Sequence, residues 1–169
     1  MCTLLTNNKE NVMISIGSSL PEVSFGRLVD GEMTNPHTNA IFGDKKVVVF
    51  AVPGAFTPTC SAAHLPGYVT IGDKIKAKGI DDIVCISVND AFVLEAWKQT
   101  QNAEHITMLA DGNATFTKNI GLDMDTGDFG GTRSLRYSML VEDGVVTKLN
   151  IEDPGRFEVS DAQTMLDSL

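Results

Sequence analysis

The chain has 169 residues, of which 43% are hydrophobic and 21% charged, a composition typical of one soluble globular domain. Its formal net charge of −9 argues against nucleic acid and anionic membranes as partners, and no apolar run has the length of a membrane span. The cysteines, an odd and sparse set of three, favour neither a disulfide-stapled secreted domain nor a Cys-x-x-Cys metal or dithiol motif.

Two regions are expected along the chain. Residues 1–15 are predicted to form a flexible tail, since the first eleven residues are polar and lack the layout of a secretion signal. Residues 16–169 carry the alternating patterns of a single domain. Because the secretion-signal layout is lacking, we expect a cytoplasmic chain.

The first half of this domain contains predicted strands separated by a loop and a helix. Valine-rich and β-branched runs predict the strands. In chain order, we expect a strand at 23–28, a turn-rich loop at 31–44, a buried strand at 46–52, a helix at 61–78 and a strand at 83–88. Pro66-Gly67 predicts a kink or break in that helix, and Gly79 predicts its end.

The second half continues the alternation and closes with a hairpin and a helix. Asn89-Asp90 is predicted to cap a helix, Asp143-Gly144 to turn a hairpin, and the capping-box pattern from Ser160 to Gln163 to open the last helix. The expected elements are a helix at 91–100, a strand at 106–109, a helix at 114–120, strands at 137–142 and 145–151, and a helix from 160. This order implies an α/β fold with a mixed central sheet and helices on both faces.

Cys60 is the strongest candidate for a reactive group. It follows the predicted strand 46–52 through the loop Pro53-Gly-Ala-Phe-Thr-Pro-Thr, which places it in the first turn of the next helix. A helix N-terminus carries partial positive charge and unpaired N–H groups, and both stabilise a thiolate over a thiol. Thr57, three residues upstream, is in place to donate a hydroxyl hydrogen bond to the sulfur or to its reaction partner. A strand followed by a helix with a reactive cysteine in its first turn is also the thioredoxin layout.

The spacing Pro53-x-x-x-Thr57-x-x-Cys60 resembles the active-site pattern of peroxiredoxins, thiol peroxidases on a thioredoxin-like fold. The wider run around it is similar to the type II, peroxiredoxin-five-like subfamily, in its plant and bacterial one-cysteine form. The matching segments, which lie in order within roughly residues 16–169, are Val52 to Ser61, His64-Leu-Pro-Gly, Cys85-Ile-Ser-Val-Asn-Asp, Ala110-Asp-Gly, Gly131-Thr-Arg-Ser and Arg136-Tyr.

The resemblance implies roles for individual residues. Cys60 becomes the peroxidatic cysteine, which peroxide oxidises to a sulfenic acid. Thr57 orients thiolate and peroxide, Arg136 places its guanidinium against both, and Pro53 shields the site from water. A fixed cation suits this reaction, because negative charge develops on the departing oxygen. Further residues expected to line the site are Gly54, Phe56 and His64.

The resemblance also implies partners. The expected substrates are hydrogen peroxide and alkyl hydroperoxides, with no metal, haem or flavin cofactor, and the expected assembly is a homodimer. Residues 155–160 lack the resolving cysteine of animal-type members, so an external thiol (glutaredoxin with glutathione, or thioredoxin) is expected to reduce the sulfenic acid. The chain ends at Leu169 without the C-terminal Tyr-Phe arm linked to overoxidation, so resistance to sulfinic acid formation is expected. The alternative function is a redox sensor or relay that uses Cys60 without efficient turnover.

Other residues carry weaker and competing interpretations. Cys85, inside the predicted strand 83–88, is either a secondary resolving thiol or a buried small hydrophobe, and the second reading is favoured. His64, four residues after Cys60, could serve as the base of a Cys–His hydrolase or as a metal partner, but packing beside the site is favoured. Arg133 is expected either to steady Arg136 or to lie at the surface. The remaining assignments are an incidental terminal thiol at Cys2, a core position for Trp97 with Phe92 and Val93, and a solvated acidic loop at 123–128.

Overall fold

The computed structural model describes residues 12–169, so Cys2 and most of the predicted tail lie outside the described residues. Ile14, within the predicted tail, packs against the domain. Ile14 is buried, and its N–H donates a hydrogen bond to the carbonyl of Ile120 at 2.8 Å.

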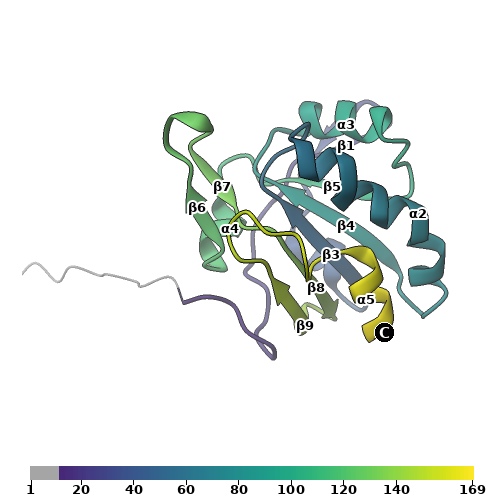
Figure 1. The fold of residues 1–169 in the computed structure, drawn as a ribbon. Helices are drawn as coiled ribbons and strands as arrows, with labels where there is room; N and C mark the ends of the chain where they lie inside the picture. Colours follow the sequence, from purple (N-terminus) through teal and green to yellow (C-terminus); the bar gives the residue numbers. More distant parts are fainter. Residues whose placement is uncertain (1–11) are drawn as a thin grey trace, which may run out of the picture.

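The centre of the fold is a five-stranded mixed sheet of order β5-β4-β3-β8-β9 (Figure 1). Strands β3, β4 and β5 run parallel, β8 is antiparallel to β3, and β9 is antiparallel to β8. The strands are β3 (Lys46–Val52), β4 (Asp82–Ser87), β5 (Thr107–Ala110), β8 (Tyr137–Glu142) and β9 (Val145–Ile151). β3 reads as an unbroken apolar run because it is central and covered on both faces.

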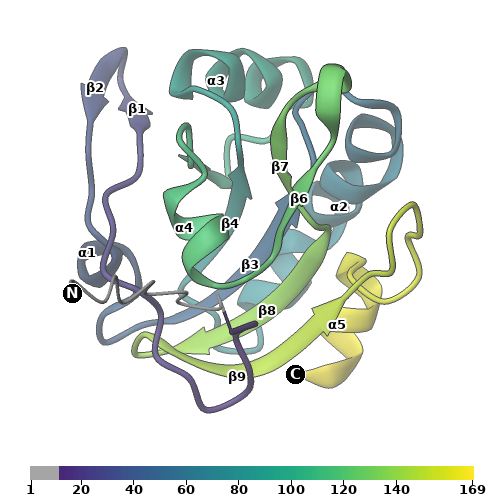
Figure 2. The same ribbon diagram turned by 90° about the vertical axis from the view of Figure 1, so that its left-hand side faces the viewer.

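Helices cover both faces of this sheet. Figure 2 shows α2 and α5 on one side and α1 with α4 on the other. The two buried hydrophobic clusters follow the same division, since alternate residues of β3 point into each. The first cluster packs against α2 (Leu65–Lys76), α3 (Ala91–Thr100) and α5 (Ala162–Ser168), the second against α1 (Thr38–Phe42) and α4 (Thr115–Asn119). The predicted α/β fold with helices on both faces is confirmed.

The sequence patterns miss the two small hairpins outside the central sheet. Strand β1 (Arg27–Val29) pairs with β2 (Glu32–Thr34) inside the expected strand and loop. Strand β6 (Asp123–Asp125), inside the acidic segment 123–128, pairs with β7 (Thr132–Ser134), which lies beyond it. β2 is fully exposed, so no hydrophobic alternation marks it. A 3₁₀ turn, η2 (Gly127–Phe129), joins β6 to β7.

The helix that follows the reactive loop begins with a π-helical turn, η1 (Cys60–His64), and continues into α2 without a break. In this turn the N–H of Leu65 donates to the carbonyl of Cys60, five residues back. Pro66 comes next and has no N–H, so it could not have closed the preceding α-helical turn. The predicted kink or break is thus replaced by a widened turn just before the proline.

Two predicted caps have different outcomes. Asp90 caps α3 by accepting a hydrogen bond from the N–H of Val93 at 2.9 Å, as expected. The cap of α5 is Asp161, which accepts from the N–H of Thr164, so the capping box predicted at Ser160 is wrong by one residue. The Ser160 hydroxyl instead donates a hydrogen bond to the carboxylate of Glu152 at 2.8 Å.

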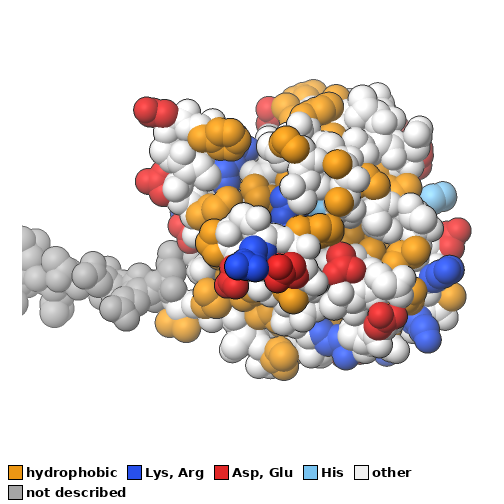
Figure 3. All heavy atoms as spheres, viewed as in Figure 1, with side chains coloured by type: hydrophobic (Ala, Val, Ile, Leu, Met, Phe, Trp, Pro, Cys, Tyr) orange, Lys and Arg blue, Asp and Glu red, His pale blue; other side chains and the backbone are white. Residues whose placement is uncertain are grey.

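The surface combines charged and apolar side chains. Figure 3 shows acidic side chains at the tip of the β6–β7 hairpin with hydrophobic atoms exposed beside them, where Phe129 is 82% exposed. Phe92, expected in the core with Trp97, is exposed, whereas Trp97 is fully buried. Within residues 12–169, no helix has the length and apolar character needed to cross a membrane.

Candidate active site

Strand register brings Arg136 and Glu152 to the edge of the sheet where β3 ends. Ala51, near the end of β3, pairs with Tyr137 at the start of β8, and Tyr137 pairs with Ile151 at the end of β9. The neighbouring Arg136 and Glu152 therefore face each other at this edge, and the N–H of Glu152 donates to the carbonyl of Arg136 at 3.0 Å. The chain leaving β3 carries the reactive loop to the same place.

Cys60 lies in the first helical turn after this loop, as predicted, and is fully buried. The turn opens with the carbonyl of Thr57, which accepts a hydrogen bond from the N–H of Ser61 at 3.0 Å. The Thr57 hydroxyl donates to the carbonyl of Gly54 at 2.7 Å. A hydroxyl has one hydrogen, so Thr57 does not donate to the sulfur, contrary to the prediction, and offers only its oxygen lone pairs as an acceptor.

The reactive loop is held from outside by Asn89. Its Oδ1 accepts hydrogen bonds from the N–H of Ala55 at 3.0 Å and from the hydroxyl of Ser87 at 2.6 Å. The next loop residue, Phe56, has φ of 63° and is 54% exposed. A positive φ is strained for an aromatic residue, so the loop needs this external support.

Arg136 connects the cysteine to a second side chain of the π turn. Its Nη2 donates to Cys60 Sγ at 3.2 Å, and its Nη1 donates to His64 Nδ1 at 2.9 Å. The guanidinium carbon also lies 5.6 Å from the centroid of the Phe157 ring, within cation–π distance. The structure thus brings Arg136 against the sulfur, the position that the sequence resemblance implied.

Arg133 takes neither of its two predicted positions. It is half-buried, and it donates to the carbonyls of Val88 at 2.8 Å and Gly130 at 3.0 Å. These bonds tie the β6–β7 hairpin to the end of β4. Arg133 therefore supports the scaffold and does not steady Arg136.

His64 is a neutral imidazole with both nitrogens engaged. Arg136 can only donate, so Nδ1 accepts, and Nε2–H donates to the carbonyl of Ser160 at 3.0 Å. Burial, together with the Arg136 charge, lowers the pKa of His64 to about 3. An imidazole with this pKa and no free lone pair is not a general base for Cys60, which removes the basis for the hydrolase interpretation. Residues 12–169 contain no group of three acidic, histidine or cysteine side chains suited to a metal ion.

A small cavity of about 110 Å³ opens beside Arg136. Its walls combine apolar and charged side chains, namely Pro53, Thr59, Met124, Leu135, Arg136, Glu152, Asp153, Pro154, Gly155 and Arg156. Pro53 belongs to this wall, whereas Cys60, Thr57, Gly54, Phe56 and His64 do not. Phe56 faces solvent, and His64 lies behind Arg136, so the sequence motif alone did not define the opening.

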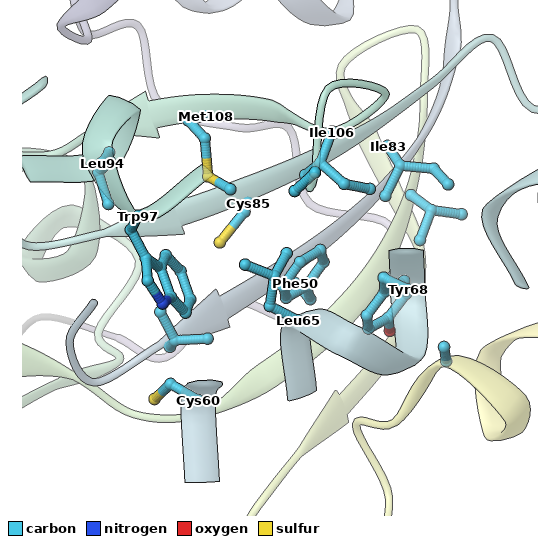
Figure 4. Packing of buried hydrophobic residues seen from close by; sticks show 14 of the residues in the cluster. Phe50, Cys60, Leu65, Tyr68, Ile83, Cys85, Leu94, Trp97, Ile106 and Met108 are labelled. Carbon is cyan, nitrogen blue, oxygen red and sulfur yellow. The ribbon is translucent and has the colours of Figure 1, made fainter. Parts of the chain in front are cut away.

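Cys85 is a fully buried residue of β4. Figure 4 shows it close to Met108 and Phe50, with the side chain of Cys60 turned away from it. Burial raises the pKa of the Cys85 thiol well above its usual value, the nearby Cys60 raises it further, and Arg136 offsets only part of this effect. These surroundings fit a packed small hydrophobe better than a reactive thiolate.

Sequence reasoning passed over two residues of this site, Asn89 and Glu152. The Asn89-Asp90 pattern predicts a helix cap, but the Asn89 side chain holds the reactive loop. Glu152 directly follows the predicted strand 145–151 and precedes Asp153-Pro154-Gly155, where an acidic residue is expected to be solvated, yet it is only 4% exposed. No local pattern distinguishes a buried carboxylate at such a position from an exposed one.

A buried cysteine that opens a helix after a central strand, in contact with a guanidinium, defines a thiol-based oxidoreductase of thioredoxin-like fold. Comparisons with known proteins give the family. A family model described as Redoxin matches residues 15–166. Peroxiredoxin-2C of Oryza sativa subsp. japonica is 43% identical over 160 residues, which cover 92% of this chain and 98% of the relative.

Two further relatives also carry peroxiredoxin names. The crystal structure of reduced Prx3 from Vibrio vulnificus in complex with H2O2 is 56% identical and covers 92% of this chain and 96% of that chain, with a TM-score of 0.90. Hybrid peroxiredoxin hyPrx5 of Haemophilus influenzae is 47% identical over 154 residues, and the chain spans 64% of its length. The chain therefore belongs to the redoxin family and, within it, to the type II, Prx5-like peroxiredoxins, which are thiol peroxidases.

Proposed function

We propose that this peroxiredoxin reduces hydrogen peroxide and alkyl hydroperoxides at Cys60 and uses an external thiol as its reductant. The observation that carries this proposal is the 3.2 Å contact between Arg136 Nη2 and Cys60 Sγ. A charged donor at this distance stabilises a thiolate and is in place to stabilise the charge that develops beside it. That the similar Vibrio vulnificus structure is described as a complex with H2O2 supports the choice of substrate.

The chemical step is a two-electron oxidation of sulfur. The Cys60 thiolate attacks one peroxide oxygen, a sulfur–oxygen bond forms, and the oxygen–oxygen bond breaks. The departing hydroxide or alkoxide takes up a proton and leaves as water or an alcohol, and Cys60 becomes a sulfenic acid. Arg136 offsets the negative charge on the breaking bond.

Neighbouring groups orient the peroxide. Thr57 Oγ1 gives its hydrogen to Gly54, so it accepts a hydrogen bond from the peroxide O–H. Cys60 is fully buried and does not line the cavity beside Arg136, so a peroxide entering this cavity must pass Arg136 to reach the sulfur, and Pro53 in the cavity wall would limit the access of water. The apolar wall of this cavity, which includes Met124 and Leu135, would accommodate the alkyl group of an organic hydroperoxide.

An external thiol, supplied by glutaredoxin with glutathione or by thioredoxin, reduces the sulfenic acid. Its thiolate attacks the Cys60 sulfur, hydroxide leaves and takes up a proton to become water, and a second thiol then cleaves the mixed disulfide to restore Cys60. Cys85 is a poor internal alternative, because it is fully buried and its pKa is raised well above the usual value. Residues 155–160 contain no cysteine that could act in its place.

Peroxide consumption by wild type and by Cys60→Ser tests this function, with glutaredoxin plus glutathione and thioredoxin supplied as separate reductants. We expect turnover with at least one reductant in the wild type and none in Cys60→Ser. Equal consumption by both proteins would exclude Cys60 as the reacting group. Oxidation of Cys60 without turnover under either reductant would favour a redox sensor.

We also propose that the protein is a homodimer built around the reactive loops. The exposed Phe56 in this loop supports the proposal, since a strained and exposed aromatic residue is suited to burial against a second copy. Sedimentation at micromolar concentration is expected to give twice the chain mass for wild type and a lower mass for Phe56→Ser. A wild-type mass equal to that of one chain would contradict the proposal.

A further inference from the structure

We propose that Glu152 is a positioning residue for the peroxidase reaction, acting through Ser160 and His64 to aim Arg136 at the Cys60 sulfur. The inference rests on the roles proposed above for Cys60 and Arg136. The side chain of Glu152 is buried, and its carboxylate makes no hydrogen bond to the Cys60 sulfur or to the guanidinium of Arg136.

The carboxylate of Glu152 organises the segment that follows β9. It accepts hydrogen bonds from the N–H groups of Glu158 at 2.8 Å, Val159 at 3.0 Å and Ser160 at 3.1 Å, and from the Ser160 hydroxyl at 2.8 Å. Burial alone raises the pKa of Glu152, but these hydrogen bonds outweigh it and hold the pKa below its usual value. The residue is therefore an ionised anchor that folds residues 153–160 back over the end of the sheet.

The anchored segment fixes the orientation of His64. Its Ser160 carbonyl accepts hydrogen bonds from His64 Nε2 at 3.0 Å and from the Tyr68 hydroxyl at 2.9 Å. A carbonyl only accepts, so this contact places the imidazole hydrogen on Nε2 and leaves Nδ1 as an acceptor. If the Ser160 carbonyl moved away, the hydrogen could shift to Nδ1, which would then repel the Nη1 donor of Arg136.

The same segment also covers the guanidinium. Phe157 belongs to the segment that Glu152 anchors. The centroid of its ring lies 5.0 Å from the centroid of the His64 ring and 5.6 Å from the guanidinium carbon of Arg136. Arg136 is thereby held by His64 Nδ1 on one terminal nitrogen and directed at Cys60 on the other. Glu152 thus determines the contact between Arg136 and His64, through Ser160.

The test compares Glu152→Gln in two backgrounds, wild type and His64→Phe. Phenylalanine keeps an aromatic ring among Phe50, Tyr68 and Phe157 but removes both nitrogens, so Glu152 can no longer act through His64. We expect Glu152→Gln to lower the rate constant of Cys60 with hydrogen peroxide about tenfold in wild type, and less than about twofold in His64→Phe. The matched control is Asp82→Asn. Asp82 is the first residue of β4 and lies at the end of the sheet away from the site, so its substitution is expected to leave the rate within about twofold of wild type.

A second readout does not depend on peroxide. Long-range ¹H–¹⁵N spectra of the His64 ring are expected to show hydrogen on Nε2 alone in wild type and in Asp82→Asn, and a tautomer mixture in Glu152→Gln. If Glu152→Gln does not fold, Ser160→Ala, which removes only the hydroxyl bond to Glu152, is measured in the same two backgrounds. The expected pattern is the same, with a smaller loss of rate in wild type.

Three outcomes would overturn the inference: an unchanged rate in Glu152→Gln, an equal loss in both backgrounds, or an unchanged His64 tautomer. An equal loss would mean that Glu152 merely stabilises the fold. Absence of any reaction between wild-type Cys60 and peroxide would instead contradict the proposed function, and the tautomer measurement would still decide whether Glu152 orients His64.

Discussion

Arg136 donates a hydrogen bond to His64 at 2.9 Å while its other terminal nitrogen contacts the sulfur of Cys60 at 3.2 Å. Both acceptors belong to one π-helical turn, η1. The fork of a single guanidinium therefore spans the first and last residues of this turn. The geometry depends on two donor nitrogens held in one plane, which only arginine supplies.

Replacing Arg136 by lysine tests this dependence. A lysine has one ammonium group, which cannot contact the sulfur and the imidazole in the same geometry. We expect Arg136→Lys to lower the rate constant of Cys60 with hydrogen peroxide about 100-fold, the size of effect typical for loss of a transition-state donor. Stopped-flow kinetics measures this rate. Arg133→Lys is the matched control, because Arg133 donates only to backbone carbonyls, and a comparable loss there would contradict the account.

The pH dependence of stability should report the buried neutral His64. Its pKa is lowered from 6.5 to about 3, so between these values the unfolded chain binds a proton that the native state does not. The free energy of unfolding therefore falls as pH decreases, by about 1–2 kcal/mol between pH 6.5 and pH 5 from this residue. Urea unfolding at the two pH values measures the difference. In His64→Phe we expect the decrease to shrink by that amount, and an undiminished decrease would contradict the assignment.

Cys85 should be dispensable for turnover. It is fully buried, so Cys85→Ala loses packing and is expected to cost about 1 kcal/mol of stability, comparable to a small deletion in the core. Turnover with the external thiol should stay within about twofold of wild type. Steady-state peroxide consumption and urea unfolding measure the two effects. Normal sulfenic acid formation without turnover in this variant would show that Cys85 resolves the intermediate.

Asn89 should hold the reactive loop in its observed conformation. Asn89→Ala leaves the Ala55 N–H and the Ser87 hydroxyl without their shared acceptor, which is expected to cost about 1–3 kcal/mol of stability. The rate of Cys60 with peroxide should fall as well, because the loop that carries it loses its support. Urea unfolding and stopped-flow kinetics measure both quantities. Asn113→Ala is the control, since that side chain is exposed, and equal effects of the two substitutions would contradict the role of Asn89.

The sequence predicts the parts of the fold that are buried in regular patterns. Strands β3, β8 and β9 have the predicted bounds, because an unbroken apolar run and an Asp-Gly turn are direct consequences of burial and of hairpin geometry. The exposed strand β2 and the acidic strand β6 could not be found in this way, since neither has a buried face with a period of two. Their pairing depends on partners that local patterns do not contain.

The same distinction applies to the site, where local motifs are predictable and tertiary contacts are not. A motif with fixed spacing predicts Cys60 and its position at the start of a helix, and the family resemblance predicts Arg136. The direction of a hydroxyl hydrogen is set by a neighbouring carbonyl, so the hydrogen bond expected from Thr57 to the Cys60 sulfur is replaced by one to the carbonyl of Gly54. The carboxylate of Glu152 is set by residues 158–160 folding back upon it, a tertiary arrangement that a local pattern cannot predict.

The most direct test of the central claim is to identify the sulfur that one equivalent of hydrogen peroxide oxidises. Reduced protein is mixed with equimolar hydrogen peroxide in the presence of dimedone, which traps sulfenic acid, and the peptides are identified by mass spectrometry. The account predicts the adduct on the Cys60 peptide, with Cys85 still a thiol, and no adduct at either position in Cys60→Ser. An adduct on the Cys85 peptide, or none on Cys60 while peroxide is consumed, would contradict it.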